Sequence, residues 1–150
     1  MNTIKALSFC LICAVAFGAA GCGGEDVDHR YDPVKDLMTD QIKLFKNTTS
    51  ALNKAESAED IADALNQWAD GMRALFPRFK ENTEILSQLK EMDPPIELQA
   101  SNRELDMAGK AMNEASAKIQ QFMDDPKVQS AQQNVAKMLE ELQEIDPSLR

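Results

Sequence analysis

Few residues of this chain could carry out chemistry by themselves. The 150 residues include three cysteines and a single histidine, His29, which follows Asp26 and Asp28 and precedes Asp32. A metal site here would require these acids to converge around His29 on an ordered loop. We do not expect such a loop from so short and highly charged a stretch. Haem-attachment, di-iron, phosphate-loop and zinc-finger motifs are absent from the sequence. The sequence therefore predicts no metal, no cofactor and no enzymatic activity.

Cys22 stands where an apolar N-terminal run ends. Lys5 is followed by ALSFCLICAVAFGAA, a run of roughly 15 residues that is shorter than the ~20 a membrane-spanning helix requires. The small residues Ala19, Ala20 and Gly21 come directly before Cys22. A positive start, an apolar middle and small residues at the end are typical of a secretory signal.

The tetrad at 19–22 resembles the lipobox of bacterial lipoprotein precursors, although that family usually has Leu in the place of Ala19. The resemblance implies that residues 1–21 are a cleaved lipoprotein signal peptide and that Cys22 carries a palmitate-type lipid anchor in the bilayer. In Gram-negative lipoproteins an Asp after the cysteine tends to retain the protein at the inner membrane. Gly23 occupies that place here, so the resemblance implies the outer membrane, with the protein facing the periplasm.

The alternative is an ordinary signal peptide that leaves Cys22 as a free thiol. Cys10 and Cys13 would leave with the signal, so Cys22 would have no disulfide partner in an oxidising compartment. Acylation removes that exposed thiol, which favours the lipoprotein interpretation.

The rest of the chain divides into a tether, a helical domain and a tail. Residues 22–32 combine two glycines with many charges and have no apolar period, which predicts a flexible tether. Residues 33–146 are the predicted helical bundle domain, and residues 147–150 are the C-terminal tail. The formal net charge of −9 argues against nucleic acid as a partner.

Apolar residues in the helical domain recur at alternating steps of three and four, the period of amphipathic helices. We expect Asp32 and Pro33 to cap and begin the first helix, and Ser57 with Asp60 resembles a capping box before the second. The four apolar stripes are Met38, Ile42, Phe45, Thr49 and Leu52; Ile61, Leu65, Trp68, Met72, Leu75, Phe79, Asn82, Leu86 and Leu89; Leu98, Ser101, Leu105, Ala108, Met112, Ala115, Ile119 and Phe122; and Val128, Ala131, Val135, Met138, Leu142 and Ile145.

Four such helices joined by short loops predict an all-α fold, an antiparallel up-down-up-down helical bundle with coiled-coil packing of long hairpins. Pro77 interrupts the second stripe, yet the period continues unchanged from Leu75 to Phe79. A proline inside a helix removes one backbone hydrogen bond and bends the helix. We therefore expect one helix kinked at Pro77 rather than two separate helices.

Folding the predicted hairpins about their loops leaves residues 81–104 without cover from the first and fourth helices. Their apolar side chains exceed what one two-helix seam can hide. This segment either bends back at Pro77 or offers an apolar patch to a partner or a membrane. The candidate partner surface consists of Ile85, Leu86, Leu89, Met92, Ile96 and Leu98.

The sequence thus favours a non-catalytic binding or scaffold module of the bacterial cell envelope. Anchored through Cys22, the protein would present segment 81–104 or a bundle groove to an envelope protein. The alternative is a carrier that holds an apolar ligand or a noncovalent cofactor in the bundle interior. The candidate pocket for that ligand is formed by Trp68, Met72, Phe76 and Phe79.

Overall fold

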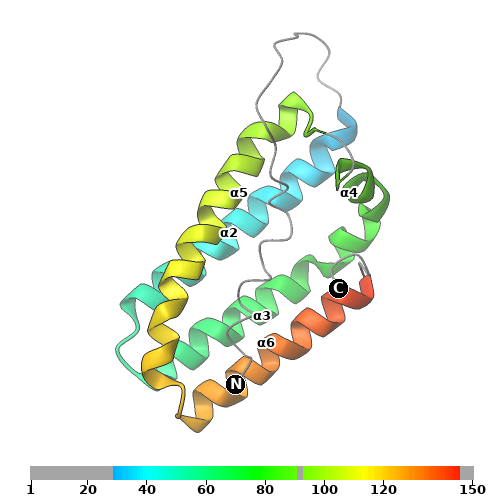
Figure 1. Cartoon of the computed structure of the whole chain (residues 1–150). Coiled ribbons are helices and arrows are strands. Elements are labelled where there is room, and N and C mark those ends of the chain that lie inside the picture. Colours follow the sequence, from blue (N-terminus) through cyan, green and yellow to red (C-terminus); the bar gives the residue numbers. More distant parts are fainter. Residues whose placement is uncertain (1–28, 91–92, 146–150) are drawn as a thin grey trace.

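The described part of the chain is built from helices. The computed structural model describes residues 29–90 and 93–145, and none of these residues belongs to a strand. The all-α class expected from the sequence is confirmed for this part of the chain (Figure 1). In chain order the elements are η2 (His29–Tyr31), α2 (Asp32–Lys54), α3 (Ala58–Glu81), α4 (Thr83–Lys90), α5 (Ile96–Ala115), η3 (Ser116–Phe122) and α6 (Pro126–Ile145).

Short side chains explain where α3 and α6 begin. Ser57 Oγ accepts a hydrogen bond from the Asp60 backbone N–H at 3.2 Å, and Asp60 Oδ2 accepts one from the Ser57 backbone N–H at 2.9 Å. This reciprocal pair confirms the predicted capping box. Before α6, Asp125 Oδ1 accepts a hydrogen bond from the Lys127 backbone N–H at 2.8 Å, next to Pro126 in the first turn.

The start of α2 differs from the prediction. Pro33 lies in the first turn as expected, but the cap position belongs to Tyr31, whose side chain makes no capping bond. The prediction of Asp32 as the cap is therefore wrong. Residues 29–31 already form a 3₁₀ turn, so the backbone is helical before it reaches Asp32. The Asp32 carboxylate instead contacts His29 Nδ1, at 2.8 Å.

Interhelical contacts give the direction of α2 relative to α5. Lys46 Nζ lies 2.5 Å from Glu104 Oε1, and further along both helices Lys118 Nζ donates to the Asn53 carbonyl oxygen at 2.9 Å. Residue numbers rise together on the two elements, so α2 runs parallel to α5 and η3.

Two ion pairs likewise give the direction of α3 relative to α6. Lys127 pairs with Glu59 at 3.1 Å near the start of both helices, and Arg73 pairs with Glu141 at 2.7 Å further along. These helices therefore also run parallel to each other.

By contrast, α2 and α3 are antiparallel. Asp40, early in α2, pairs with Arg78, late in α3. The most extensive contacts of the described residues are between α3 and α6, then between α2 and α5, then between α2 and α3 (Figure 1). The short loops led us to expect each helix to pack chiefly on the next in sequence. The structure instead joins α5 to α2 and α6 to α3.

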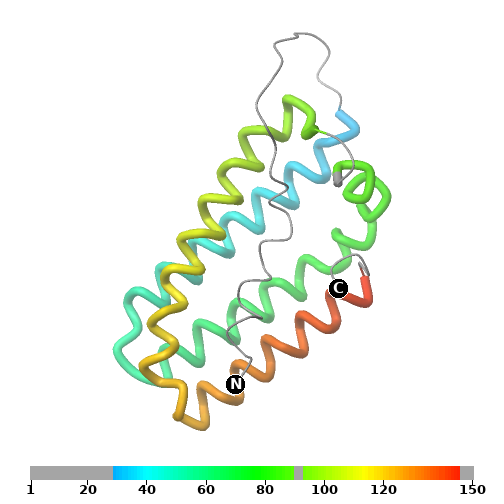
Figure 2. Tube along the Cα trace, in the orientation of Figure 1, coloured from blue at the N-terminus to red at the C-terminus, as the bar shows by residue number. Residues whose placement is uncertain are grey.

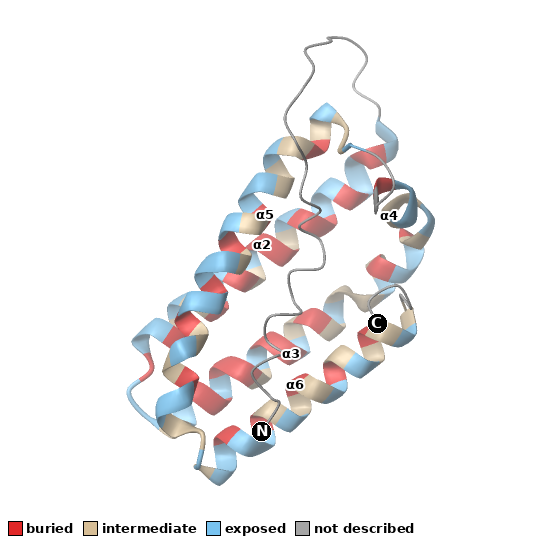
Figure 3. Cartoon of the chain, in the orientation of Figure 1, coloured by how far each residue is buried: buried red, intermediate tan, exposed pale blue. Residues whose placement is uncertain are grey.

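The predicted stripes supply the core. Most of their positions are buried, and the buried residues lie on the facing sides of the helices (Figure 3). The largest fully buried side chains are Trp68, Phe45, Leu37, Leu52, Ile61, Leu65, Leu98, Ile119, Met138, Val34 and Val128. The three-four period therefore identified the inward faces correctly even though it did not decide which helices are neighbours.

Pro77 lies inside α3, which continues to Glu81. The prediction of one helix running through Pro77 is confirmed. The same helix was expected to reach Leu89, and that extension is wrong, because α3 ends at Glu81, with Asn82 as its cap, and α4 begins at Thr83.

Side-chain hydrogen bonds lie at the end of α3. Asn82 Nδ2 donates to the Arg78 carbonyl oxygen at 2.8 Å, and Thr83 Oγ1 donates to the Phe79 carbonyl oxygen at 3.1 Å. The Arg78 carbonyl oxygen also accepts the Asn82 backbone N–H, at 3.1 Å, so the two side chains add hydrogen bonds to the last turn of α3. Asn82, expected on the packing seam, is buried, and it lies at the C-terminal cap of α3.

Segment 81–104 is not a straight two-helix extension. The chain changes direction between α3 and α4, so that α4 is seen nearly along its axis where α3 is seen from the side (Figure 2). The third predicted helix is also shorter than expected, because the α-helix ends at Ala115 and continues as 3₁₀ helix through Phe122.

Candidate functional site

The predicted lipidation site lies outside the described residues. Cys22 and the cleavage residues Ala19, Ala20 and Gly21 all precede residue 29, where the description begins. His29, at that boundary, is exposed and contacts Asp32. Among the described residues, no group of three or more His, Cys, Asp or Glu side chains is placed to hold a metal ion.

The residues of the candidate partner surface differ in how far they are buried. Leu89 and Leu98 are buried, and Ile85 and Leu86 are partly buried and pack against the core. Ile96, by contrast, is 58% exposed. Met92 lies outside the described residues. Of the five described members, Ile96 is therefore the large side chain that remains available to a partner.

The candidate pocket residues form part of the closed core. Trp68, Met72 and Phe79 are buried, and Phe76 is partly buried against the same cluster. The indole N–H of Trp68 is fully buried and has no hydrogen-bond partner. Leaving such a donor unpaired costs about 1–3 kcal/mol. It is the one polar atom of the candidate pocket that a ligand acceptor could satisfy.

Two open hollows lie along the groove between α2 and α5. Their volumes are about 350 and 660 Å³, and both are lined by Lys46, Ala108 and Ala111. Thr49 lines the smaller hollow, and its buried hydroxyl oxygen has no hydrogen-bond partner. Met107, which is 62% exposed, lines the larger hollow. The groove is therefore lined by small apolar side chains and a few charged side chains at the surface.

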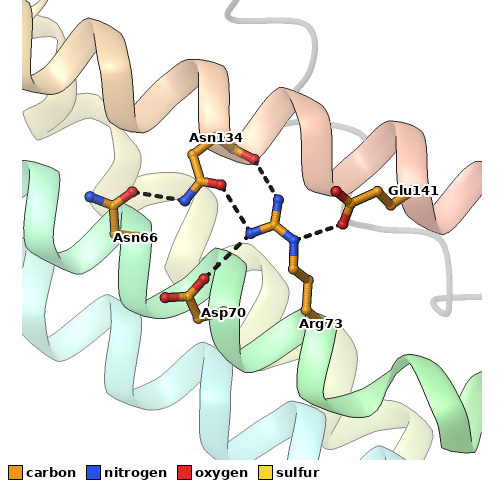
Figure 4. Close-up of polar contacts among 5 residues, drawn as sticks. All are labelled: Asn66, Asp70, Arg73, Asn134 and Glu141. Carbon is orange, nitrogen blue, oxygen red and sulfur yellow. Dashed lines mark hydrogen bonds and ion pairs between the residues drawn. The ribbon is translucent and has the colours of Figure 1, made fainter.

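A polar network joins α3 to α6 (Figure 4). Arg73 Nε donates to Glu141 Oε2 at 2.7 Å, and its terminal nitrogens donate to Asn134 Oδ1 at 2.9 Å and to the Asn134 carbonyl oxygen at 3.4 Å. Asn134 Nδ2 donates in turn to Asn66 Oδ1 at 2.9 Å. Asp70 adds a longer contact to Arg73, at 3.4 Å. The guanidinium thus has acceptors on both helices.

The charges in these contacts are fixed rather than poised to exchange a proton near neutral pH. The hydrogen bond with Arg73 lowers the pKa of Glu141, and the same bond raises the pKa of Arg73 further above its ordinary value. Hydrogen bonds from Arg78 and then Lys43 lower the pKa of Asp40. Each shift favours the ionised form. The arrangement is suited to holding helices in register.

Sequence reasoning missed the α3–α6 network and the α2–α5 groove. Asn66, Arg73 and Asn134 each lie one residue beside a stripe position, which is the signal for a polar group at the edge of a helix interface. Which helix would meet that edge could not be inferred from spacing, because the sequence does not show that α3 and α6 are neighbours.

Comparisons of the chain with protein-family models, with curated proteins and with solved structures found no match. A search of the described residues for a helix long and apolar enough to cross a membrane found none. Function is therefore inferred from the residues of this chain.

Proposed function

We propose that this protein is a lipid-anchored, non-catalytic binding module of a bacterial cell envelope. The observation that carries the proposal is the sequence Ala19-Ala20-Gly21-Cys22, placed after a short apolar run that begins near Lys5. In this proposal residues 1–21 are removed and Cys22 is acylated. The protein then faces the periplasm, at the outer membrane in preference to the inner membrane.

The helices form the body that the anchor holds. We propose that the four long helices act as one antiparallel up-down-up-down bundle with coiled-coil packing. Because α2 and α5 run parallel, the tether enters at the end of the body where Ile96 is exposed. The last four residues of the predicted tether, 29–32, are helical in the structure, and the remaining residues, 22–28, span at most about 25 Å when fully extended. That end would therefore work close to the bilayer, where tethering raises its local concentration for an envelope protein.

The anchor is tested by metabolic labelling of the full-length chain with a palmitate analogue, followed by intact mass measurement of the membrane fraction. We expect a labelled protein that begins at Cys22, and complete loss of label in Cys22→Ser. The variant Cys10→Ser is the matched control and should be labelled normally, because Cys10 leaves with the signal. An unlabelled protein that begins at another residue would refute the anchor.

The partner surface is tested separately, by cross-linking the full-length protein in its own membranes. We expect Ile96→Glu to lose a cross-linked envelope protein that the parent chain and the exposed-site control Gln133→Glu both retain. Retention of that partner by Ile96→Glu would exclude this end of the bundle as the binding surface.

A carrier function is the second candidate, and the unpaired Trp68 indole N–H favours it. An apolar ligand with one acceptor would occupy the region of Trp68, Met72, Phe76 and Phe79. Native mass spectrometry of gently extracted protein would show a small-molecule adduct that Trp68→Phe binds more weakly. The bare protein mass would exclude a stably bound ligand.

A further inference from the structure

The outward side of α5 carries a second apolar stripe. Ile96 and Met107 are the large hydrophobic side chains with high exposure among the described residues, at 58% and 62%. Ala100 and Ala111 are exposed as well. Steps of four, seven and four residues place these four on one side of a helix with 3.6 residues per turn. Three of the four, Ala100, Met107 and Ala111, line the larger hollow between α2 and α5.

The stripe is complementary to itself in size. Consider two α5 helices packed antiparallel about a two-fold axis that passes between residues 103 and 104. Ile96 of one copy then lies level with Ala111 of the other, and Met107 lies level with Ala100. Each layer pairs a large side chain with a small one, which allows two straight helices to approach closely. A parallel pair would instead place each large side chain against its own copy.

The charges at the centre of the stripe have the same symmetry. Arg103 is exposed and forms no hydrogen bond or ion pair with the described residues. Next to it, Glu104 pairs with Lys46 across the groove. In the antiparallel register Arg103 of each copy lies level with Glu104 of the other, giving two opposite-charge pairs. In a parallel register Arg103 would face Arg103, which is repulsive.

We propose that α5 is a self-association surface, through which two copies of this chain pair antiparallel by Ile96, Ala100, Met107 and Ala111. A second copy is favoured over an unrelated helix because one two-fold axis satisfies both the size pattern and the charge pattern. The pairing is independent of the proposed lipid anchor, and it makes a second copy of this chain, in place of another envelope protein, the partner that Ile96 contacts.

The pairing also sets an orientation, which does rest on the proposed anchor at Cys22. An antiparallel pair separates the two anchored ends by roughly 30–35 Å along α5, at 1.5 Å per residue. A tether of about 25 Å cannot make up that distance if the helices stand upright on the bilayer. Both anchors reach one bilayer only when the α5 helices are tilted well away from the bilayer normal, so that the two anchored ends differ in height by less than the tether's reach.

Cysteine cross-linking in native membranes tests the register. Single variants Ile96→Cys, Arg103→Cys and Ala111→Cys are made in the full-length chain and oxidised, with Gln133→Cys on α6 as the exposed control. A disulfide requires Cα atoms within about 7 Å. In the antiparallel register residue 103 lies next to its own copy, whereas residues 96 and 111 lie about 22 Å from theirs.

We expect Arg103→Cys to form a disulfide-linked dimer, and Ile96→Cys to do so only when co-expressed with Ala111→Cys. The cross-linked fraction of Arg103→Cys, and that of Ile96→Cys co-expressed with Ala111→Cys, should be about tenfold higher than the fraction of Ile96→Cys alone or Ala111→Cys alone. Both should exceed the Gln133→Cys control by the same factor. Equal self-cross-linking at 96, 103 and 111 would indicate a parallel pair and overturn the proposal. Absence of cross-linking in the matched pair would overturn it too.

Three further substitutions complete the test: one separates the pairing from the anchor, and two reverse the charges at the centre of the stripe. In the parent chain Cys22 is unchanged, so a disulfide formed at Cys22 would show that its thiol is free. That result would contradict acylation of Cys22 but not the pairing of α5. The series is therefore repeated with Cys22→Ser. Arg103→Glu should reduce cross-linking of the matched Ile96→Cys and Ala111→Cys pair about tenfold, by placing like charges together. Adding Glu104→Arg should restore it. Failure of that restoration would contradict the proposed register.

Discussion

Two glycines inside helices provide a sharp test of the packing between α2 and its neighbours. Gly109 lies within α5 and Gly71 within α3. Replacing a mid-helix glycine by alanine favours the helix by about 1 kcal/mol. The same substitution should have opposite results at the two sites because the space around each is different.

At Gly109 an added Cβ would lie 3.7 Å from Phe45 Cε2, an ordinary van der Waals contact. We expect Gly109→Ala to raise the free energy of unfolding by about 1 kcal/mol, or the melting temperature by about 4 °C. At Gly71 the added Cβ would lie 2.5 Å from Leu44 Cδ1, so Leu44 must move away from the core against which it packs. Overpacking of this kind costs about 1–3 kcal/mol. We expect Gly71→Ala to be destabilising by about 1 kcal/mol once the helix gain is subtracted.

The assay is urea unfolding of the full-length mature protein in mild detergent, followed by circular dichroism. Leu44→Ala provides the matched background, because it removes the atoms that Gly71→Ala would meet. In that background Gly71→Ala should become stabilising by about 1 kcal/mol. A destabilising Gly109→Ala, or a Gly71→Ala effect that is unchanged by Leu44→Ala, would refute the described packing of α2 on α5 and α3.

The remaining predictions concern the charged contacts. The pKa of Asp40 in the folded protein is below its ordinary value of 3.8, so the folded state binds fewer protons than the unfolded state. Its contribution to stability is therefore present above about pH 4 and is lost as the pH falls through the lowered pKa. Asp40→Asn should therefore flatten the acid limb of a stability profile. Arg73→Lys should lower the urea midpoint more than Lys137→Gln does, because a lysine cannot reach Glu141 and both acceptors of Asn134 at once. An unchanged midpoint would show that the α3–α6 network does not stabilise the fold. Ser57→Ala should lower the midpoint by removing the cap of α3, and Ser57→Asp should retain most of the stability.

Most of the helical content could be predicted from the sequence because its causes are local. Apolar residues that recur at steps of three and four lie on one side of a helix, and that side is buried. The buried stripes through Phe45 and through Met138 were therefore identified from spacing alone. The capping box at Ser57 uses atoms within four residues of each other. The prediction failed at Asn82, where the apolar period continues towards Leu89 but α3 ends and α4 begins at Thr83.

The candidate sites were predicted less well because exposure depends on neighbours. Leu89 and Leu98 belong to the proposed partner surface and are buried, whereas Ile96, two residues from Leu98, is exposed. Both outcomes follow from where α4 and the start of α5 meet the body. Cys22 is the opposite case, since the signal for acylation is a short linear motif and that prediction remains to be tested.

The sequence by itself determined the helical class and the inward face of each helix. Only the tertiary structure decided that α5 lies along α2 and that α6 lies along α3. The physical reason is that an apolar stripe specifies a need for burial without specifying a partner. Directional contacts such as Arg73 with Glu141, and close approaches such as Phe45 against Gly109, distinguish among the arrangements that would satisfy it. The same choice of neighbours leaves Ile96 and Met107 on an open face.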